Sequence, residues 1–131
     1  MTSKSTKQYE EVLTALKNAV TQYGRIMCDF EQSILKAVRR VYEGVTLNCC
    51  LFHLGQSSYK KIQEESLQVA YNDKDERSIK EFTHVILALA YVPPDDVPAA
   101  FAELSDAVPD ELLGVTDYFS RIYVWQKGKR P

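Results

Sequence analysis

The fold of this chain is decided by the stretch Arg25-Ile26-Met27-Cys28-Asp29-Phe30-Glu31, a short apolar run that ends in an acid and leads into an amphipathic segment. Alternation along a strand places Ile26, Cys28 and Phe30 on one face, and the other face is also largely apolar. Such a strand is typical of a parallel sheet that is covered on both sides. We therefore predict a buried strand over residues 25–30, with Asp29 near its carboxyl end.

The residues that follow this strand predict a βαβ unit. Residues 31–42 have apolar side chains at helical spacing, with Glu31 in the first turn and Arg39 and Arg40 in the last, which matches the helix dipole. Residues 45–52 read as a second strand, which should run parallel to the first after a right-handed crossover. Ligands gather at the carboxyl ends of such strands, where Asp29 and residues 50–53 are expected.

The remainder of the chain is predicted to be helical. Ser5 and Gln8 fit a capping box at the start of a helix over residues 5–23, and Gly24 is in position to end it. After residue 54 we expect helices over residues 55–71 and 76–91, and two more that begin at Asp95 and Asp110. The fold class is therefore α/β and mainly helical, with an α/β segment over residues 1–54 and an all-α segment over residues 55–131. Two strands make a poor sheet alone and leave unpaired edges, so we expect them to belong to a larger sheet.

Composition limits the possible function classes. The chain has 131 residues, the size of one modest domain, and its net charge of -2 gives no support to wrapping a polyanion. Three cysteines without framework spacing argue for an intracellular, reducing compartment. No apolar run approaches the roughly 18 residues of a membrane span, and the N-terminus has no apolar signal region, so we expect neither a membrane span nor a signal peptide.

Asp29 is the first candidate for chemistry. A carboxylate at a strand end can bind a hard divalent cation such as Mg²⁺, although two-metal phosphoryl transfer needs more than one carboxylate. The alternative is that Asp29 caps the helix that follows. Glu31 is either a second ligand or a first-turn acid that stabilises this helix.

Cys50 and His53 form a Cys-x-x-His pair at the end of the second predicted strand. A thiolate and an imidazole can bind zinc, but a structural zinc site takes four ligands. Cys28 on the neighbouring strand could join them, whereas alternation turns Cys49 away from Cys50. The alternative is a buried thiol beside a hydrogen-bonded histidine.

A second histidine, a group of aromatic residues and three basic pairs each have a structural interpretation as well as a functional one. His84 lies next to the apolar stripe of its helix, at the boundary with solvent, rather than in a metal site. The aromatic residues near the end of the chain could form a surface for another protein: Tyr118, Tyr123 and Trp125. Three basic pairs could contact phosphate or belong to solvated surfaces: Arg39-Arg40, Lys60-Lys61 and Lys129-Arg130.

Three motifs together resemble the Mutator-like (MULE) transposase domain: Cys28-Asp29-Phe30-Glu31, Cys50-Leu51-Phe52-His53 and Pro93-Pro94-Asp95-Asp96-Val97. The resemblance extends over about residues 1–123. It implies a ribonuclease H-like fold in which two Asp and one Glu bind two Mg²⁺ or Mn²⁺ ions that cut and join DNA strands. Asp29 matches the second catalytic Asp, Cys50 and His53 match the Cys-x-x-His motif, and the helices from Gly55 onward match an all-α insertion.

The resemblance places the family's first Asp ahead of Met1 and its Glu beyond the helical insertion, so the chain carries one of three catalytic acids. It therefore implies a transposase fragment that is inactive alone, whose partners are transposon DNA ends and the rest of the transposase, and whose location is nuclear. One alternative is a non-catalytic binding or assembly module derived from a transposase. A second is a small zinc or thiol module around Cys28, Cys50 and His53.

Overall fold

The computed structural model describes residues 5–20 and 24–125. These described residues are mainly helical, with 69% helix and 7% strand, and the strands form one two-stranded parallel sheet. The chain divides into two compact units, Met1–His53 and Leu54–Pro131. The mainly helical α/β class expected from the sequence is confirmed.

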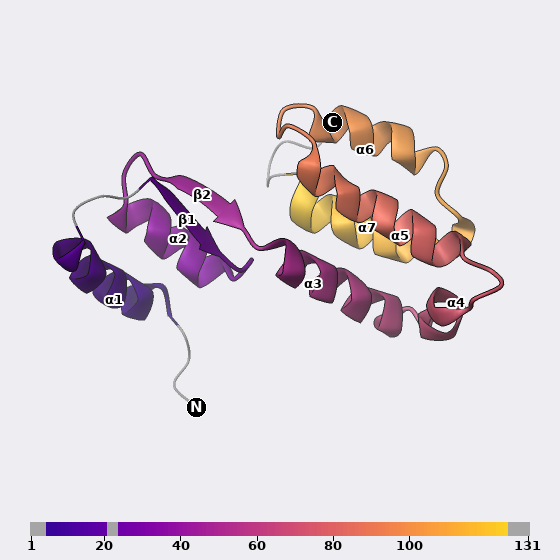
Figure 1. Cartoon of the computed structure of the whole chain (residues 1–131), viewed down its shortest axis with the longest axis horizontal. Coiled ribbons are helices and arrows are strands. Elements are labelled where there is room, and N and C mark those ends of the chain that lie inside the picture. The colour runs from indigo at the N-terminus through magenta and orange to yellow at the C-terminus, as the bar shows by residue number, and fades with distance from the viewer. Residues whose placement is uncertain (1–4, 21–23, 126–131) are drawn as a thin grey trace. The chain divides into compact units, whose positions relative to one another are not determined.

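The first unit is a βαβ unit preceded by a helix (Figure 1). Its elements are α1 (Thr6–Ala19), β1 (Arg25–Cys28), α2 (Gln32–Val41) and β2 (Thr46–Cys49). The strands β1 and β2 pair in parallel, with Ile26 opposite Leu47 and Cys28 opposite Cys49. The parallel pairing predicted from the strand–helix–strand pattern is therefore confirmed.

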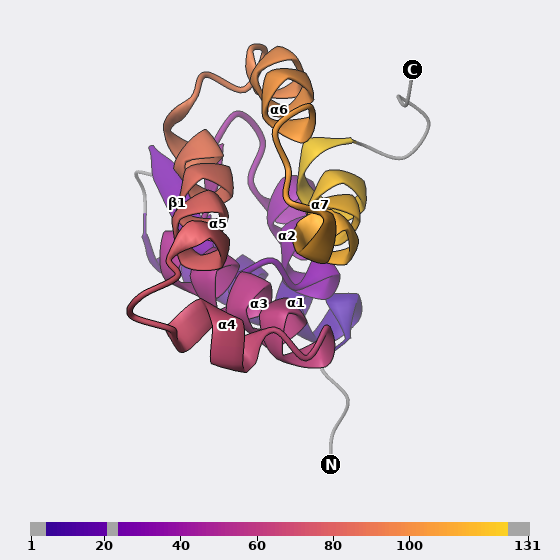
Figure 2. The ribbon, with the colours of Figure 1, turned by 90° about the vertical axis from the view of Figure 1, so that its right-hand side faces the viewer.

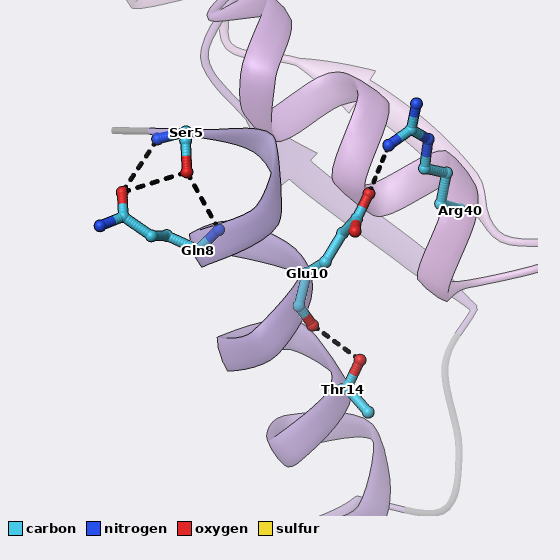
Figure 3. A network of polar contacts seen from close by, with 5 residues as sticks. All are labelled: Ser5, Gln8, Glu10, Thr14 and Arg40. Atoms are coloured by element: carbon cyan, nitrogen blue, oxygen red, sulfur yellow. Dashed lines mark hydrogen bonds and ion pairs between the residues drawn. The ribbon is translucent and has the colours of Figure 1, made fainter. Parts of the chain in front are cut away.

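The start of α1 is fixed by the predicted capping box, which Figure 3 shows. The Gln8 backbone N–H donates to Ser5 Oγ at 3.3 Å, and the Ser5 N–H donates to Gln8 Oε1 at 3.0 Å. These bonds use N–H groups that have no partner inside the helix. Glu10 on the same helix forms an ion pair of 2.7 Å with Arg40 and so links α1 to α2.

The predicted end of α1 is wrong. The helix ends at Ala19, Val20 has an extended backbone, and Gly24 is not in the left-handed conformation of a C-terminal cap. The predicted residues 21–23 lie outside the described part of the chain. Gly44 does take the left-handed conformation, with φ of 73°, just after α2, which is the conformation that glycine adopts most readily.

The core of the first unit lies on α2, where Leu35, Ala37 and Val38 are buried, whereas no described residue of α1 is buried. The prediction that the sheet is covered on both sides is wrong. Burial alternates along β1, and Met27 is 66% exposed. The reason is that Met27 faces away from the side of Ile26 and Cys28, which are partly buried.

The second unit is helical (Figures 1 and 2). Its core joins Ile62, Ile79, Leu112 and Val115 from separate elements. The elements, in order, are α3 (Leu51–Glu64), which begins just before the boundary, α4 (Gln68–Asn72), α5 (Ser78–Ala88), η1 (Leu89–Tyr91), α6 (Val97–Ser105), η2 (Asp110–Leu112), α7 (Leu113–Phe119) and the π-helical turn η3 (Ser120–Val124).

Two predicted elements differ in length from those observed. The predicted strand over residues 45–52 ends at Cys49, because its neighbour β1 ends at Cys28. The last described hydrogen bond between the two segments runs from the Cys50 N–H to the Cys28 carbonyl. Leu51 then begins α3. The predicted helix over residues 55–71 is interrupted, because Ser66 takes a φ of 60° between α3 and α4.

Two predicted caps are also wrong. Asp96, not Asp95, precedes α6, and its side chain makes no capping hydrogen bond. Pro98 lies in the first turn of α6, where its missing N–H costs nothing. Asp110 lies inside the short helix η2, which Pro109 precedes. Acidic residues and prolines are adjacent before both α6 and η2, so the local sequence offered several possible capping residues and did not distinguish between them.

Candidate functional site

Asp29 lies directly after β1 and holds the start of the next helix. Its Oδ1 accepts a hydrogen bond from the backbone N–H of Glu31 at 3.0 Å, and Glu31 is the N-cap of α2. The helix-start interaction proposed as the alternative role for Asp29 is therefore present. A carboxylate has about four lone-pair sites, so this bond leaves acceptor capacity for another ligand. The two roles of Asp29 are compatible.

Glu31 is engaged by a residue of α1. The Tyr9 hydroxyl donates to Glu31 Oε2 at 3.0 Å. The pKa of Tyr9 is raised by partial burial of the phenol, then by this hydrogen bond and by the negative charges of Glu31 and Asp29. Tyr9, Asp29 and Glu31 therefore lie near one another at the carboxyl end of β1. Sequence reasoning missed Tyr9, because its helical spacing indicated only a core position.

Cys28 and Cys49 face each other across the parallel strands. Burial raises the pKa of both thiols, and the charge of Asp29 raises them further, while the Arg39 guanidinium lowers them. Cys49 also contributes to the raised pKa of Cys28. These groups share the α2 side of the sheet, near the end where Asp29 lies. Cys28, which was expected as a possible partner of Cys50, is thus the register partner of Cys49.

Cys50 and His53 lie on either side of the junction between β2 and α3. Cys50 follows the last strand residue, and its backbone N–H donates to the Cys28 carbonyl at 2.9 Å. His53 lies in the first turn of α3, is exposed, and packs edge-on against the Phe52 ring with centroids 5.8 Å apart. Among the described residues, no group of three or more His, Cys, Asp and Glu side chains is placed to hold a metal ion.

One member of each described basic pair has an acidic partner. Arg40 pairs with Glu10 on α1, and Lys61 pairs with Glu65 at 2.6 Å. The hydrogen bond with Glu65 is the main reason that the pKa of Lys61 is raised. The predicted pair Lys129-Arg130 lies outside the described residues.

The histidine and tyrosine candidates of the second unit form polar contacts. The ring Nε2 of His84 lies 3.3 Å from the Tyr71 hydroxyl, and His84 is exposed. The Tyr123 hydroxyl donates to Ser57 Oγ at 2.7 Å, and the Tyr118 hydroxyl is also 2.7 Å from that oxygen. These contacts join α3 to α7 and η3, so Tyr118 and Tyr123 have a packing role within the unit.

Comparisons of the chain with protein-family models, with curated proteins and with solved structures gave no match. Within the described ranges, no helix has both the length and the apolar character needed to cross a membrane.

Proposed function

We propose that this chain is a segment of a Mutator-like transposase with a ribonuclease H-like fold, in which Asp29 is one of the metal-binding acids. The observation that carries the proposal is the position of the Asp29 carboxylate directly after a parallel strand, held by the Glu31 N–H at 3.0 Å. The carboxyl ends of parallel strands are where such folds bind ligands. The Asp-Phe-Glu and Cys-x-x-His motifs support the same assignment. The proposed partners are transposon DNA ends, and the proposed location is the nucleus.

The described residues fit a limited role in metal binding. Mg²⁺ is usually bound through one or two carboxylates, with waters and substrate phosphates completing its shell. Mg²⁺ or Mn²⁺, when bound, would supply Lewis-acid activation of a DNA phosphate. Asp29 and Glu31 each accept one described hydrogen bond, from the Glu31 N–H and from the Tyr9 hydroxyl, so both carboxylates keep acceptor capacity. We assign the metal to Asp29, because Asp29 is the residue that matches a catalytic acid in the resemblance, and Glu31 to the start of α2.

Paramagnetic broadening by Mn²⁺ tests this assignment. We expect Mn²⁺ to broaden the amide NMR signals of Cys28, Asp29 and Phe30 first in the full chain. Asp29→Asn should remove the broadening, because the amide keeps an oxygen that can accept the Glu31 N–H but loses the negative charge. Glu31→Gln is the matched control and should leave the broadening in place. Equal loss in both variants, or broadening elsewhere only, would contradict the role of Asp29.

Strand transfer tests whether one acid is sufficient. Two-metal catalysis needs more than one carboxylate to hold both ions. We therefore expect the 131-residue chain alone to give no Mn²⁺-dependent strand transfer on a terminal-repeat DNA. Product that disappears in Asp29→Ala would overturn this expectation and would show catalysis by the chain alone.

A second candidate function is assembly with another polypeptide. Among the described residues each strand pairs with one neighbour only, and Met27 on β1 is 66% exposed. An unpaired strand edge beside an exposed apolar side chain is a site for strand addition. Sedimentation at increasing concentration would show self-association that Met27→Lys reduces. A well-folded chain that stays monomeric and binds no added strand would count against this function.

A further inference from the structure

The two cysteines that face each other across β1 and β2 form a dithiol that the proposed function does not use. In the parallel ladder Cys28 is opposite Cys49, and register partners point to the same side of a sheet. Both thiols are free and partly buried, on the side of Ile26 and Leu47 rather than that of Met27. The third cysteine, Cys50, follows β2 and by alternation points away from this pair.

The geometry of a parallel ladder disfavours a direct disulfide. Neighbouring strands lie about 4.8 Å apart, and parallel side chains start from Cβ atoms at a similar separation. A relaxed disulfide needs Cβ atoms about 3.8 Å apart. An atom between the two sulfurs removes this mismatch, because two metal–sulfur bonds span a longer distance than one sulfur–sulfur bond.

We propose that Cys28 and Cys49 form a two-thiolate site for a soft monovalent cation of the Cu(I) type. Thiolates select soft cations such as Cu(I). Zinc in a structural site takes four ligands, and the described residues contain no group of three or more suitable side chains. Cu(I) is stable with two thiolate ligands, so it is the cation that this pair fits. Binding replaces the two thiol protons with the cation and involves no redox step.

The site differs in chemistry from the proposed metal position at Asp29. A carboxylate oxygen suits hard cations, whereas paired thiolates suit soft ones. Two charged side chains act on the pair: Asp29 raises the pKa of both thiols, and Arg39 lowers the pKa of both. The proposal of a Cu(I) site can therefore fail without affecting the transposase assignment, and the transposase assignment can fail without affecting the Cu(I) site.

An anaerobic titration of the full chain with Cu(I), in competition with a chromophoric Cu(I) chelator, tests the proposal. We expect one equivalent of Cu(I) to be retained by the wild-type chain. Cys28→Ser and Cys49→Ser should each weaken binding by more than the roughly 10–100-fold typical of losing an outer-shell partner. Cys50→Ser is the matched control and should bind as the wild type does. Failure of the wild type to compete, or an equal loss in Cys50→Ser, would overturn the proposal.

Protection from alkylation gives a second readout that needs no variant. In the native chain loaded with Cu(I), we expect Cys28 and Cys49 to be protected from iodoacetamide while Cys50 is modified. Fragmentation of the modified peptides by mass spectrometry distinguishes Cys49 from Cys50. Protection of Cys50 together with only one of the other two cysteines would overturn the pairing, even if Cu(I) binds.

Discussion

Two buried threonines differ in what their hydroxyl groups contact. Thr83 Oγ1 donates to the Ile79 carbonyl at 2.7 Å, whereas Thr116 Oγ1 and Ser58 Oγ have no hydrogen-bond partner among the described residues. Both threonines are at most 7% exposed. A buried polar group without a partner costs about 1–3 kcal/mol, whereas a satisfied one contributes about 1 kcal/mol.

Valine substitutions at these threonines should therefore have opposite effects. We expect Thr116→Val to raise the free energy of unfolding by about 1 kcal/mol, because it removes an unpaired hydroxyl at nearly constant shape. Thr83→Val is the matched control and should lower it by about 1 kcal/mol. Urea unfolding followed by circular dichroism measures both values. Destabilisation by Thr116→Val would indicate that its hydroxyl has a partner, such as a bound water.

Single residues also show which contacts could be predicted from the local sequence and which could not. The pairing of Ser5 with Gln8 was predicted correctly, because both residues lie within one helical turn. The left-handed Ser66 and the contact of Tyr9 with Glu31 were not predicted. A left-handed residue is usually a glycine, so the serine at position 66 gave no signal of this conformation. Tyr9 and Glu31 are 22 positions apart in the chain, so only packing brings these two side chains together.

At the scale of elements, the start of α5 is held by carboxylates. Asp73 Oδ1 accepts the backbone N–H groups of Asp75 and Glu76, at 2.8 and 3.3 Å, and Glu76 Oε1 accepts the Ser78 N–H at 3.1 Å. The backbone hydrogen bonds lower the pKa of Asp73 from its ordinary 3.8. The hydrogen bonds of Ser78, first from its side chain and then from its backbone, lower the pKa of Glu76 from its ordinary 4.5.

This arrangement predicts an acid-dependent loss of stability. Because both pKa values are lower in the folded chain, the stabilisation is complete above the ordinary values and is lost as the pH falls through the lowered ones. We expect the unfolding temperature to fall as the pH is lowered from roughly 6 to 3. The double variant Asp73→Asn/Glu76→Gln should show a shallower fall over this range. Superimposable pH curves for the two proteins would refute the role of these carboxylates.

The residue at which a strand ends depended on the neighbouring strand. The Val-Thr-Leu-Asn-Cys-Cys-Leu-Phe run over residues 45–52 predicted a strand, but β2 ends at Cys49. A strand continues only while a neighbour offers hydrogen bonds, and β1 ends at Cys28. The predicted helix types were largely correct, because their apolar spacing is a local signal.

At the scale of the whole molecule, charge is unevenly divided along the chain. Residues 1–53 carry seven Lys and Arg against five Asp and Glu, whereas residues 54–131 carry nine against thirteen. Phosphate backbones are bound mainly by basic side chains. Arg39 in the first unit is exposed, and its charge acts on Cys28, which precedes Asp29. Under the proposed transposase function, the DNA contact would therefore lie on the first unit.

Salt-dependent DNA binding tests this expectation. Arg39→Gln should weaken binding to duplex DNA and reduce the slope of log affinity against log salt by roughly 0.9, the value for one lost phosphate contact. Lys80→Gln is the control, because exposed Lys80 lies over the Tyr71 ring at 5.8 Å in the acidic second unit. It should leave the slope unchanged. An equal change in both variants would place the DNA contact elsewhere.

The sequence by itself determined the order of the main helices and strands, the parallel direction of the strands and the place of Asp29 after the first of them. These features follow from apolar periodicity, caps and the length of the crossover, which are all local. Only the tertiary structure decided that Cys28 faces Cys49, that Tyr9 engages Glu31, and that Met27 is exposed. The physical reason is that strand register and burial depend on which surfaces pack together, and periodicity along one segment does not specify its partner.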